Sequence, residues 1–389
     1  GAGGFTVTGG LETISAVNGA GRLRLENGAL TLTGTSAISG VISGTGALTV
    51  DGGAVTISNA ANTNTGDTVV EDGTLTLTGN VGGAMKVNGG ELEVNGGTVG
   101  GATTNDGGTI DIAGGTFTGG LTNTNGTVEA EGAVSGDIVN EGTFTVTADM
   151  TGGAANSFRN GTIATTSSGV LNVLNGSMTG FGSIGNDLGT INVGSGRTLG
   201  ATTITNESGS ATSIILTSGT ISGAFTNRGL VTSSGASTIN GSFANTGTVD
   251  MANGTTGDTL AISGTTTGTG IYQLDLNLSS GATDRVNGTG GISGTVNLQF
   301  AVTGGGVALA PVTVMTGVAN GTGVTQTGLP LGGGILYTVE NNGGNLQVVS
   351  DVNGAVSGVA AGAALTQSLI GSVVNRPTSP FLSSLAEGE

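Results

Sequence analysis

The sequence contains no cysteine, no histidine and no tryptophan, and only four of its 389 residues are proline. Without cysteine there is no disulfide, no zinc site built on thiolates and no cysteine nucleophile. Without histidine a Ser-His-Asp triad cannot form, and the imidazole ligands that catalytic metals usually use are missing. These absences argue against serine proteases, cysteine proteases and most metalloenzymes.

Aromatic residues and long apolar runs are also scarce. Aromatic residues make up 3% of the chain, and no run of 18 or more apolar residues occurs, so no transmembrane helix is expected. The sequence has no Gly-x-Ser-x-Gly elbow and no Walker-type loop ending in Gly-Lys-Ser/Thr. We therefore expect no nucleotide site, no cofactor and no catalytic site, so a non-enzymatic protein.

Positive charge is rare as well. Eight basic residues stand against 25 acidic ones, which gives a formal net charge of −17. A chain this acidic is repelled by nucleic acid and by anionic lipid, so neither nucleic acid nor direct insertion into lipid is expected. The charge also helps to keep a β protein with many strand edges soluble.

Glycine, in contrast, is abundant, with 81 residues. Four segments share one pattern, in which a glycine opens the unit and two apolar residues flank a polar one: Gly90–Val94, Gly108–Ile112, Gly126–Ala130 and Gly142–Val146. Their opening glycines are 18, 18 and 16 residues apart. A short strand that returns at a nearly constant interval is typical of a parallel β-solenoid.

The repeat predicts an all-β parallel β-helix with coils of about 16–20 residues, in which Leu92, Ile110 and Val128 stack inside the rod. Roughly twelve to fourteen coils up to residue 251 would make a rod of about 60 Å. The register advances by only 7 or 8 residues at Gly46 to Gly53 and at Gly161 to Gly169, which we interpret as loops or shortened coils. Asn-Gly dipeptides such as Asn160-Gly161 predict sharp turns, and in an antiparallel meander, the main alternative fold, they would mark hairpins.

Three acidic residues, Glu93, Asp111 and Glu129, occupy the outward position of consecutive repeats. They are expected to form a row with a spacing of about 4.8 Å, in which like charges repel one another. The first interpretation is a solvated acidic face. A weak Ca²⁺ site and the carboxylate pair of a glycan-cleaving β-helix remain alternatives, although no aromatic residue accompanies the row to stack a sugar.

Threonines supply a second candidate surface, with Thr74, Thr109, Thr127, Thr143 and Thr162 directly after the opening glycines. Rows of hydroxyl groups can bind a partner. The simpler explanation is that β-branched residues are favoured in strands.

The composition changes after residue 257, where six segments follow in order: Gly257–Leu260, Gly268–Leu276, Ala282–Gly288, Pro311–Met315, Leu336–Val339 and Asn345–Val348. In order and spacing they resemble the C-terminal module of pertactin-like autotransporter passengers, the autochaperone region that caps the β-helix and templates its folding. The residues that carry this resemblance are Asp258, Leu260, Tyr272, Leu274, Asp284, Arg285, Val286, Pro311 and Tyr337.

The resemblance implies three parts: a right-handed β-helix stalk over 1–256, the capping module over 257–351, and a linker over 352–389 with a short helix and then a proline-containing segment. It further implies an adhesin exported through the outer membrane to the bacterial cell surface by a β-barrel of the same precursor. The implied partner is a host-cell or matrix receptor, or another copy of the chain. A self-associating scaffold and, less favoured, a glycan-active enzyme remain alternatives.

Overall fold

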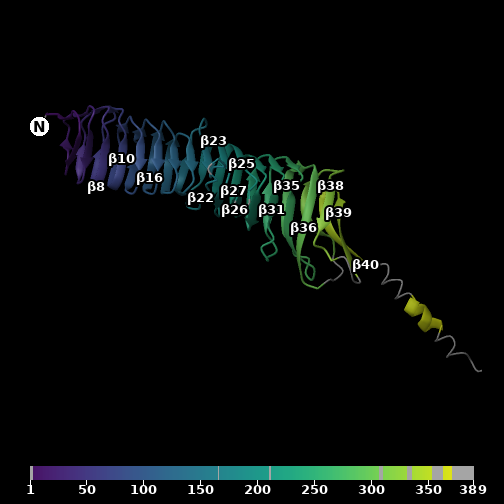
Figure 1. The fold of residues 1–389 in the computed structure, drawn as a ribbon. Coiled ribbons are helices and arrows are strands. Elements are labelled where there is room, and N and C mark those ends of the chain that lie inside the picture. The colour runs from purple at the N-terminus through teal and green to yellow at the C-terminus, as the bar shows by residue number, and fades with distance from the viewer. Residues whose placement is uncertain are drawn as a thin grey trace, which may run out of the picture.

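The computed structural model describes residues 3–164, 166–209, 212–305, 310–330, 335–352 and 362–369. The chain winds into an elongated parallel β-helix, with its N-terminal strands at one end of the rod and a β-hairpin at the other (Figure 1). Three parallel sheets run along the rod, and successive strands of each sheet come from successive coils. The fold class predicted from the repeat is confirmed.

The first sheet carries the most regular column of side chains. Its strands pair in parallel, coil upon coil, until β37. They are β2 (Leu11–Ile14), β5 (Ala29–Leu32), β8 (Leu48–Ile57), β10 (Thr68–Leu77), β12 (Met85–Val87), β15 (Thr103–Asn105), β17 (Leu121–Asn123), β19 (Ile138–Asn140), β21 (Ser157–Asn160), β23 (Met178–Asn186), β25 (Thr198–Asn206), β27 (Thr220–Asn227), β30 (Phe243–Asn245), β33 (Thr266–Gly268), β35 (Arg285–Ile292) and β37 (Val312–Val318).

The second sheet contains the glycine-opened segments found in the sequence. The C-terminal halves of β8 and β10 belong to it, because these long strands bend round a corner. Its other strands are β3 (Asn18–Gly19), β6 (Ser36–Ile38), β13 (Glu91–Val94), β16 (Thr109–Phe117), β18 (Thr127–Ser135), β20 (Thr143–Thr151), β22 (Gly169–Val173), β24 (Gly189–Val193), β26 (Ser213–Thr217), β28 (Leu230–Ser234), β31 (Thr248–Asp250), β34 (Ile271–Asn277), β36 (Thr295–Thr303) and β38 (Gly323–Thr327).

The third sheet completes each coil and includes one end of several long strands, among them β16, β18, β23 and β35. Its remaining strands are β1 (Phe5–Val7), β4 (Leu23–Leu25), β7 (Ile42–Gly44), β9 (Thr63–Asn64), β11 (Asn80–Val81), β14 (Thr98–Val99), β29 (Ala236–Asn240), β32 (Thr259–Ile262), β39 (Ile335–Asn342) and β40 (Asn345–Val352). At its end β40 pairs antiparallel with both β37 and β39. This hairpin interrupts the parallel stacking and covers the edge of β37.

The core is a single column of side chains along the rod. Leu92 pairs with Ile110 and Ile110 with Val128, and all three are fully buried, as the repeat predicts. One continuous cluster of buried apolar residues extends from Val7 to Val348. Because each coil packs mainly on its two neighbours, the core grows along the axis without becoming thicker.

The coil length is less constant than predicted. The range of 16–20 residues is wrong for the coil from Asn160 to Asn186, which takes 26 residues. It is also wrong near the C-terminus, where Tyr272 pairs with Leu298 and Leu298 with Gln326, so these coils take 26 and 28 residues. The extra residues form loops at the corners and leave the pairing within the sheets intact.

One of the two short steps in the repeat has a different origin from the one expected. The segments that follow Gly46 and Gly53 belong to different sheets of the same coil, so the interpretation as a loop or shortened coil is wrong there. The step from Gly161 to Gly169 is a loop, in which Ile163 is 57% exposed.

Parallel pairing passes residue 257 without interruption, since Asp250 pairs with Gln273 and Gln273 with Gln299. The segment 257–351 therefore continues the solenoid before it ends in the β39–β40 hairpin. A short helix spans 362–369, where the sequence predicts one, and the proline-containing segment 375–381 lies outside the described residues. Among the helical residues described, none belongs to a helix long and apolar enough to cross a membrane.

Candidate functional site

Glu93, Asp111 and Glu129 form the acidic ladder, a row on the outer face of the second sheet. Glu93 pairs with Asp111 and Asp111 with Glu129, so the carboxylates stack as the repeat predicts. Asp111 and Glu129 are exposed, while half-buried Glu93 accepts a hydrogen bond of 2.8 Å from the Thr76 hydroxyl. Water can reach the row and reduce the repulsion between its charges.

The acidic ladder does not converge on a single point. Within the described part of the chain, no group of three or more acidic residues is arranged to hold a metal ion. Stacked side chains on one sheet face point in parallel and away from the rod, whereas a Ca²⁺ site needs oxygens that surround the ion. The Ca²⁺ interpretation gains no support from this arrangement.

The threonine row is shorter than predicted. Thr109, Thr127 and Thr143 stack directly on the second sheet. The next residue in that column is Val170, because Thr162 lies in the loop between β21 and β22. The assignment of Thr162 to the row is therefore wrong. The sequence pattern takes Gly161, before the loop, as the opening glycine, whereas the strand of the sheet begins at Gly169, after the loop.

Eight asparagines stack inside the rod and form the asparagine ladder, at the last first-sheet position of eight successive coils. They are Asn105, Asn123, Asn140, Asn160, Asn186, Asn206, Asn227 and Asn245, and each is at most 1% exposed. Every Nδ2 except the last donates to the Oδ1 of the asparagine in the following coil, at 2.8–3.0 Å. All these amides therefore point in the same direction along the rod.

The first five ladder amides, Asn105 to Asn186, also hold the backbone of two coils together. The Nδ2 of Asn123 donates to the carbonyl of Gly126 in its own coil, at 3.0 Å, and to that of Thr143 in the next, at 3.1 Å. Asn160 repeats this arrangement with the carbonyls of Gly169 and Thr190. A buried amide is tolerated at low cost when its hydrogen bonds are made, and here they link neighbouring coils.

The ladder begins abruptly. In the four preceding coils the same position holds an aliphatic residue, and these residues are Leu32, Val50, Val70 and Val87. Among the described residues the buried Oδ1 of Asn105 has no hydrogen-bond partner, because it faces the coil of Val87. At the other end Asn245 pairs with Gly268.

The sequence analysis did not find this ladder. It assigned Asn160-Gly161 to a turn, and the chain does turn there, with Gly161 at φ 75°, but the side chain of Asn160 is fully buried within the stack. The available signal was an asparagine followed within three residues by glycine, as in Asn123 to Gly126 and Asn227 to Gly229, recurring about once per coil. A local reading of Asn-Gly favours a turn, because the partner that buries the amide lies a whole coil away.

The glycine that opens each repeat has a steric reason. A Cβ on Gly126 would lie 2.1 Å from the Nδ2 of Asn105 and 2.4 Å from the carbonyl oxygen of Gly108. A Cβ on Gly142 would lie 2.4 Å from the carbonyl oxygen of Gly126. The coils approach so closely beside the asparagine ladder that only glycine fits.

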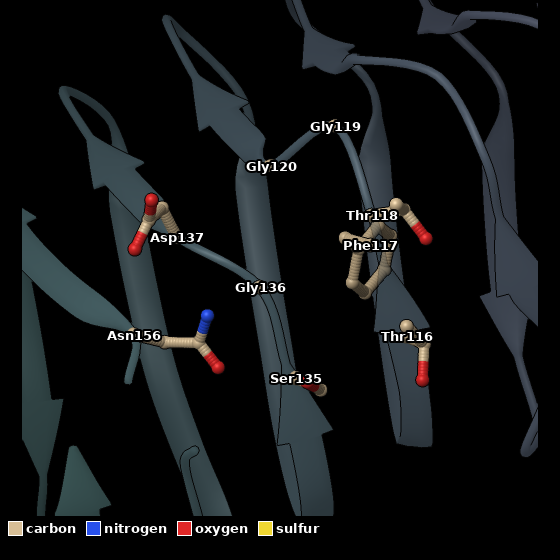
Figure 2. A pocket seen from close by; sticks show the side chains of 9 residues that line it. All are labelled: Thr116, Phe117, Thr118, Gly119, Gly120, Ser135, Gly136, Asp137 and Asn156. Carbon is tan, nitrogen blue, oxygen red and sulfur yellow. The ribbon is translucent and has the colours of Figure 1, made fainter. Parts of the chain in front are cut away.

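A groove of about 370 Å³ lies at the corner where the third sheet leads into the first (Figure 2). Asp137 and Asn156 lie on one side, Thr116 and Thr118 on the other, and Gly136 between them. A second hollow of about 350 Å³ adjoins it and shares Thr116 and Ser135 with it. We call the first hollow the corner groove; its full lining is Thr116, Phe117, Thr118, Gly119, Gly120, Ser135, Gly136, Asp137 and Asn156.

Asp137 is the only charged residue that lines the corner groove. Its Oδ1 accepts hydrogen bonds from the backbone N–H of Ser157 at 2.7 Å and from the Ser157 hydroxyl at 3.0 Å. In the part of the chain that the structure describes, its Oδ2 has no hydrogen-bond or ion-pair partner. The carboxylate is thus fixed by one oxygen and offers the other to a ligand.

Charge is distributed unevenly along the rod. Residues 51–149 include thirteen carboxylates and a single basic residue, Lys86, whereas residues 150–250 include three acidic and three basic residues. Two arginines of the second stretch form ion pairs, Arg159 with Asp187 and Arg228 with Glu207. The acidic ladder and the corner groove therefore share the most negative stretch of the protein.

Asp284 joins three segments within the C-terminal module. Its Oδ1 accepts hydrogen bonds from the backbone N–H groups of Gly257 and Asp258, and its Oδ2 accepts one from that of Asp275. Burial, which is the largest influence, and the nearby carboxylates of Asp258 and Asp275 raise the pKa of Asp284 to about 6, against the opposing effect of the backbone hydrogen bonds. This carboxylate therefore titrates at mildly acidic pH.

The other module residues chosen from the sequence are mostly structural. Leu260, Tyr272, Leu274, Val286 and Tyr337 belong to the buried core. Burial raises the pKa of the Tyr272 hydroxyl to about 12, and hydrogen bonding with the Asn245 side chain partly opposes this shift.

Three landmarks remain, and they lie at the surface or at a junction between strands. Asp258 accepts hydrogen bonds from the Gly235 N–H at 2.8 Å and the Asn253 Nδ2 at 2.6 Å. The exposed Arg285 donates from Nε to the Thr313 carbonyl at 3.3 Å, and Pro311 is exposed just before β37. All three residues contribute to the ends of coils and not to a common pocket.

Comparison with known proteins finds similarity among solved structures. No family model and no curated protein match the chain. Among solved structures, the crystal structure of the Haemophilus influenzae Hap adhesin matches with 13% identity and a TM-score of 0.35, over 89% of this chain and 49% of that one. The chain thus spans about half the length of the adhesin structure, and a similarity this low carries no conclusion about activity.

Proposed function

We propose that this chain is the passenger part of an autotransporter, displayed at the bacterial cell surface, where it acts as a non-enzymatic adhesin stalk. The observation that carries this proposal is a long β-helix whose last coils contain the sequence landmarks of a passenger capping module and end in the β39–β40 hairpin. The absence of cysteine suits a chain that must stay unfolded during export. A rod projects a binding surface away from the membrane.

The polar surface favours binding over catalysis. The corner groove has a single carboxylate, and its neighbour Asn156 cannot act as a general acid. The acidic ladder is open to water, with no enclosed site to exclude it. Measuring adhesion of cultured epithelial cells to surfaces coated with the chain tests this function. We expect saturable adhesion that soluble protein inhibits, and adhesion equal to that on an albumin coat would contradict it.

The C-terminal module is proposed to template folding. Its coils present paired strand edges on which the preceding coil can add, and Asp284 ties three of its segments together. Deleting 257–351 should slow refolding of the remaining stalk from urea at least tenfold, because the first coil then has no template and must nucleate alone. An unchanged refolding rate and an unchanged resistance to protease would contradict this role.

Self-association is a second candidate, favoured by one feature of the second sheet. Val170, Leu230 and Ile271 occupy the same outward column, and each is 37–38% exposed. The surrounding stretch, 150–250, has no net charge to keep two rods apart. Sedimentation at several protein concentrations separates the two functions, because a scaffold shows concentration-dependent dimers that Leu230→Lys abolishes and a host-directed adhesin stays monomeric.

A further inference from the structure

We propose that the corner groove, together with the acidic ladder on the same strands, forms a docking site for a basic polypeptide segment, with a lysine or arginine side chain of the partner inserted beside Asp137. This inference rests on the adhesin function proposed above and names the chemistry of its partner. It requires a protein ligand with clustered positive charge, and neither a metal nor a sugar.

The groove has the size and the acceptors that a cationic side chain needs. Its volume of about 370 Å³ admits one long side chain, and glycines on its wall leave the backbone accessible. The Oδ2 of Asp137 is free to accept a charge-assisted hydrogen bond, while Ser157 holds Oδ1 in place. The side-chain oxygens of Thr116, Ser135 and Asn156 supply further acceptors round the opening.

The surrounding charge favours the same ligand. The acidic ladder lies on the second-sheet part of β16 and β18, and the corner groove lies at the end of their third-sheet part, since β16 carries Asp111 and Thr116 and β18 carries Glu129 and Ser135. Five or six residues of strand separate them, a distance of at most about 20 Å. A basic segment that places one side chain in the groove therefore has further carboxylates within reach, and long-range attraction accelerates its approach.

Carbohydrate is a poorer fit. Sugars usually stack on an exposed aromatic face, and the only aromatic residue of the lining, Phe117, is completely buried. Anionic glycans would also be repelled by the thirteen carboxylates between residues 51 and 149. A basic polypeptide can form an ion pair with the Asp137 carboxylate and is also attracted by the negative charge of residues 51–149. A neutral sugar can do neither.

The test is binding of a fluorescein-labelled nonalysine peptide to the whole chain, followed by fluorescence anisotropy in 50 mM salt. Asp137→Asn should weaken binding about fivefold, the loss expected for one partly exposed ion pair. The matched control is Asp149→Asn, which removes an equal charge from another exposed corner where the carboxylate likewise accepts a backbone N–H, that of Ser177 at 2.8 Å. This control should change binding less than twofold.

A second variant tests the cavity without changing charge. Ser135→Leu places a larger side chain at an exposed position of the groove and should weaken peptide binding by a similar factor, while circular dichroism confirms an unchanged fold. Equal effects of the two aspartate variants, or full binding by Ser135→Leu, would overturn the site in favour of a diffuse acidic surface. Binding of chitotriose that Asp137→Asn abolishes, without binding of the peptide, would overturn the choice of ligand.

The adhesion assay keeps this inference separate from the proposed function. If the chain supports cell adhesion and Asp137→Asn leaves both adhesion and peptide binding intact, the docking site is wrong and the adhesin function stands. If peptide binding depends on Asp137 but no cell adhesion occurs, the docking site stands and the adhesin function is wrong.

Discussion

The coils before Asn105 and the coils from Asn105 to Asn245 have the same three sheets but differ at one buried position. The first group fills it with Leu32, Val50, Val70 and Val87, and the second fills it with stacked asparagines. The parallel pairing is continuous across the change. The same coil can therefore be built round a column of aliphatic residues or round a column of hydrogen-bonded amides.

The two groups differ in how strongly they specify register. An aliphatic side chain packs almost equally well after a small shift along the strand, whereas a ladder amide loses its hydrogen bonds to the next coil. Asn123 alone would lose its bonds to Asn140 and to the Thr143 carbonyl. The asparagine ladder therefore adds register specificity where coil lengths vary most, including the 26-residue coil from Asn160 to Asn186.

The largest expected effect comes from adding a methyl group beside the ladder. Gly126→Ala should destabilise the protein by about 3 kcal/mol, because the new Cβ would overlap the Asn105 amide and backbone that cannot move aside. Gly90→Ala, in a coil without a ladder, should cost less, since its closest contacts are at 2.7 Å and one of them is the side chain of Val70. Urea denaturation followed by circular dichroism measures both. Equal losses would remove the distinction between the two groups of coils.

Interrupting the ladder should have the next largest effect. Asn160→Leu leaves the Oδ1 of Asn186 without its donor and the Nδ2 of Asn140 without its side-chain acceptor. We expect a loss of about 2 kcal/mol, the usual cost of unsatisfied buried polar groups. Val87→Leu at the equivalent ladder-free position should cost less than about 1 kcal/mol. The measurement is again the urea midpoint, and a smaller loss for Asn160→Leu than for Val87→Leu would contradict this account.

Asp284 sharpens the comparison, because it links coils through a carboxylate that titrates, whereas the ladder amides do not. Its pKa of about 6 in the folded protein lies above the ordinary value of 3.8, so the folded state binds the proton more tightly than the unfolded state. The contribution of this proton to stability is complete below about pH 4 and is lost as pH rises through about 6, by about 1 kcal/mol after allowance for solvent screening.

The measurement is the change in urea midpoint between pH 4 and pH 7 for Asp284→Asn and for the parent chain. The variant should lose this part of the pH dependence, while Asp149→Asn, at an exposed corner, should keep it. If the urea midpoint changed equally between pH 4 and pH 7 in all three proteins, Asp284 would not be the source of the pH dependence of stability.

Extending the ladder should have the smallest effect. Val87→Asn places an amide where Gly90, Thr109 and Asn105 offer acceptors at the spacing that the existing ladder uses, including the unpartnered Oδ1 of Asn105. Stability should therefore change by less than about 1 kcal/mol. Val50→Asn is the control and should cost at least about 2 kcal/mol, because the next coil has Val70 at this position and no amide. Equal losses would show that ladder contacts do not stabilise the coil.

Much of the second sheet could be predicted from the sequence. The alternation of Leu92, Glu93 and Val94 after Gly90 places side chains inside and outside the rod, and its recurrence one coil later places Ile110 on Leu92. The first sheet was harder to predict, because its strands, such as β17, are short and end in asparagine. A buried asparagine and a turn asparagine look alike in sequence, since burial depends on the coils above and below.

The sequence by itself determined that the chain forms a β-solenoid with a negative surface, because side-chain alternation and the interval between glycines are local properties that recur along the chain. Tertiary structure alone decided which asparagines are buried, which of two glycines continues a column, and where Asp137 meets Asn156 in a groove. The physical reason is that these features are contacts between coils. Such contacts depend on the length of each coil and on where its corners lie, and the repeat fixes neither.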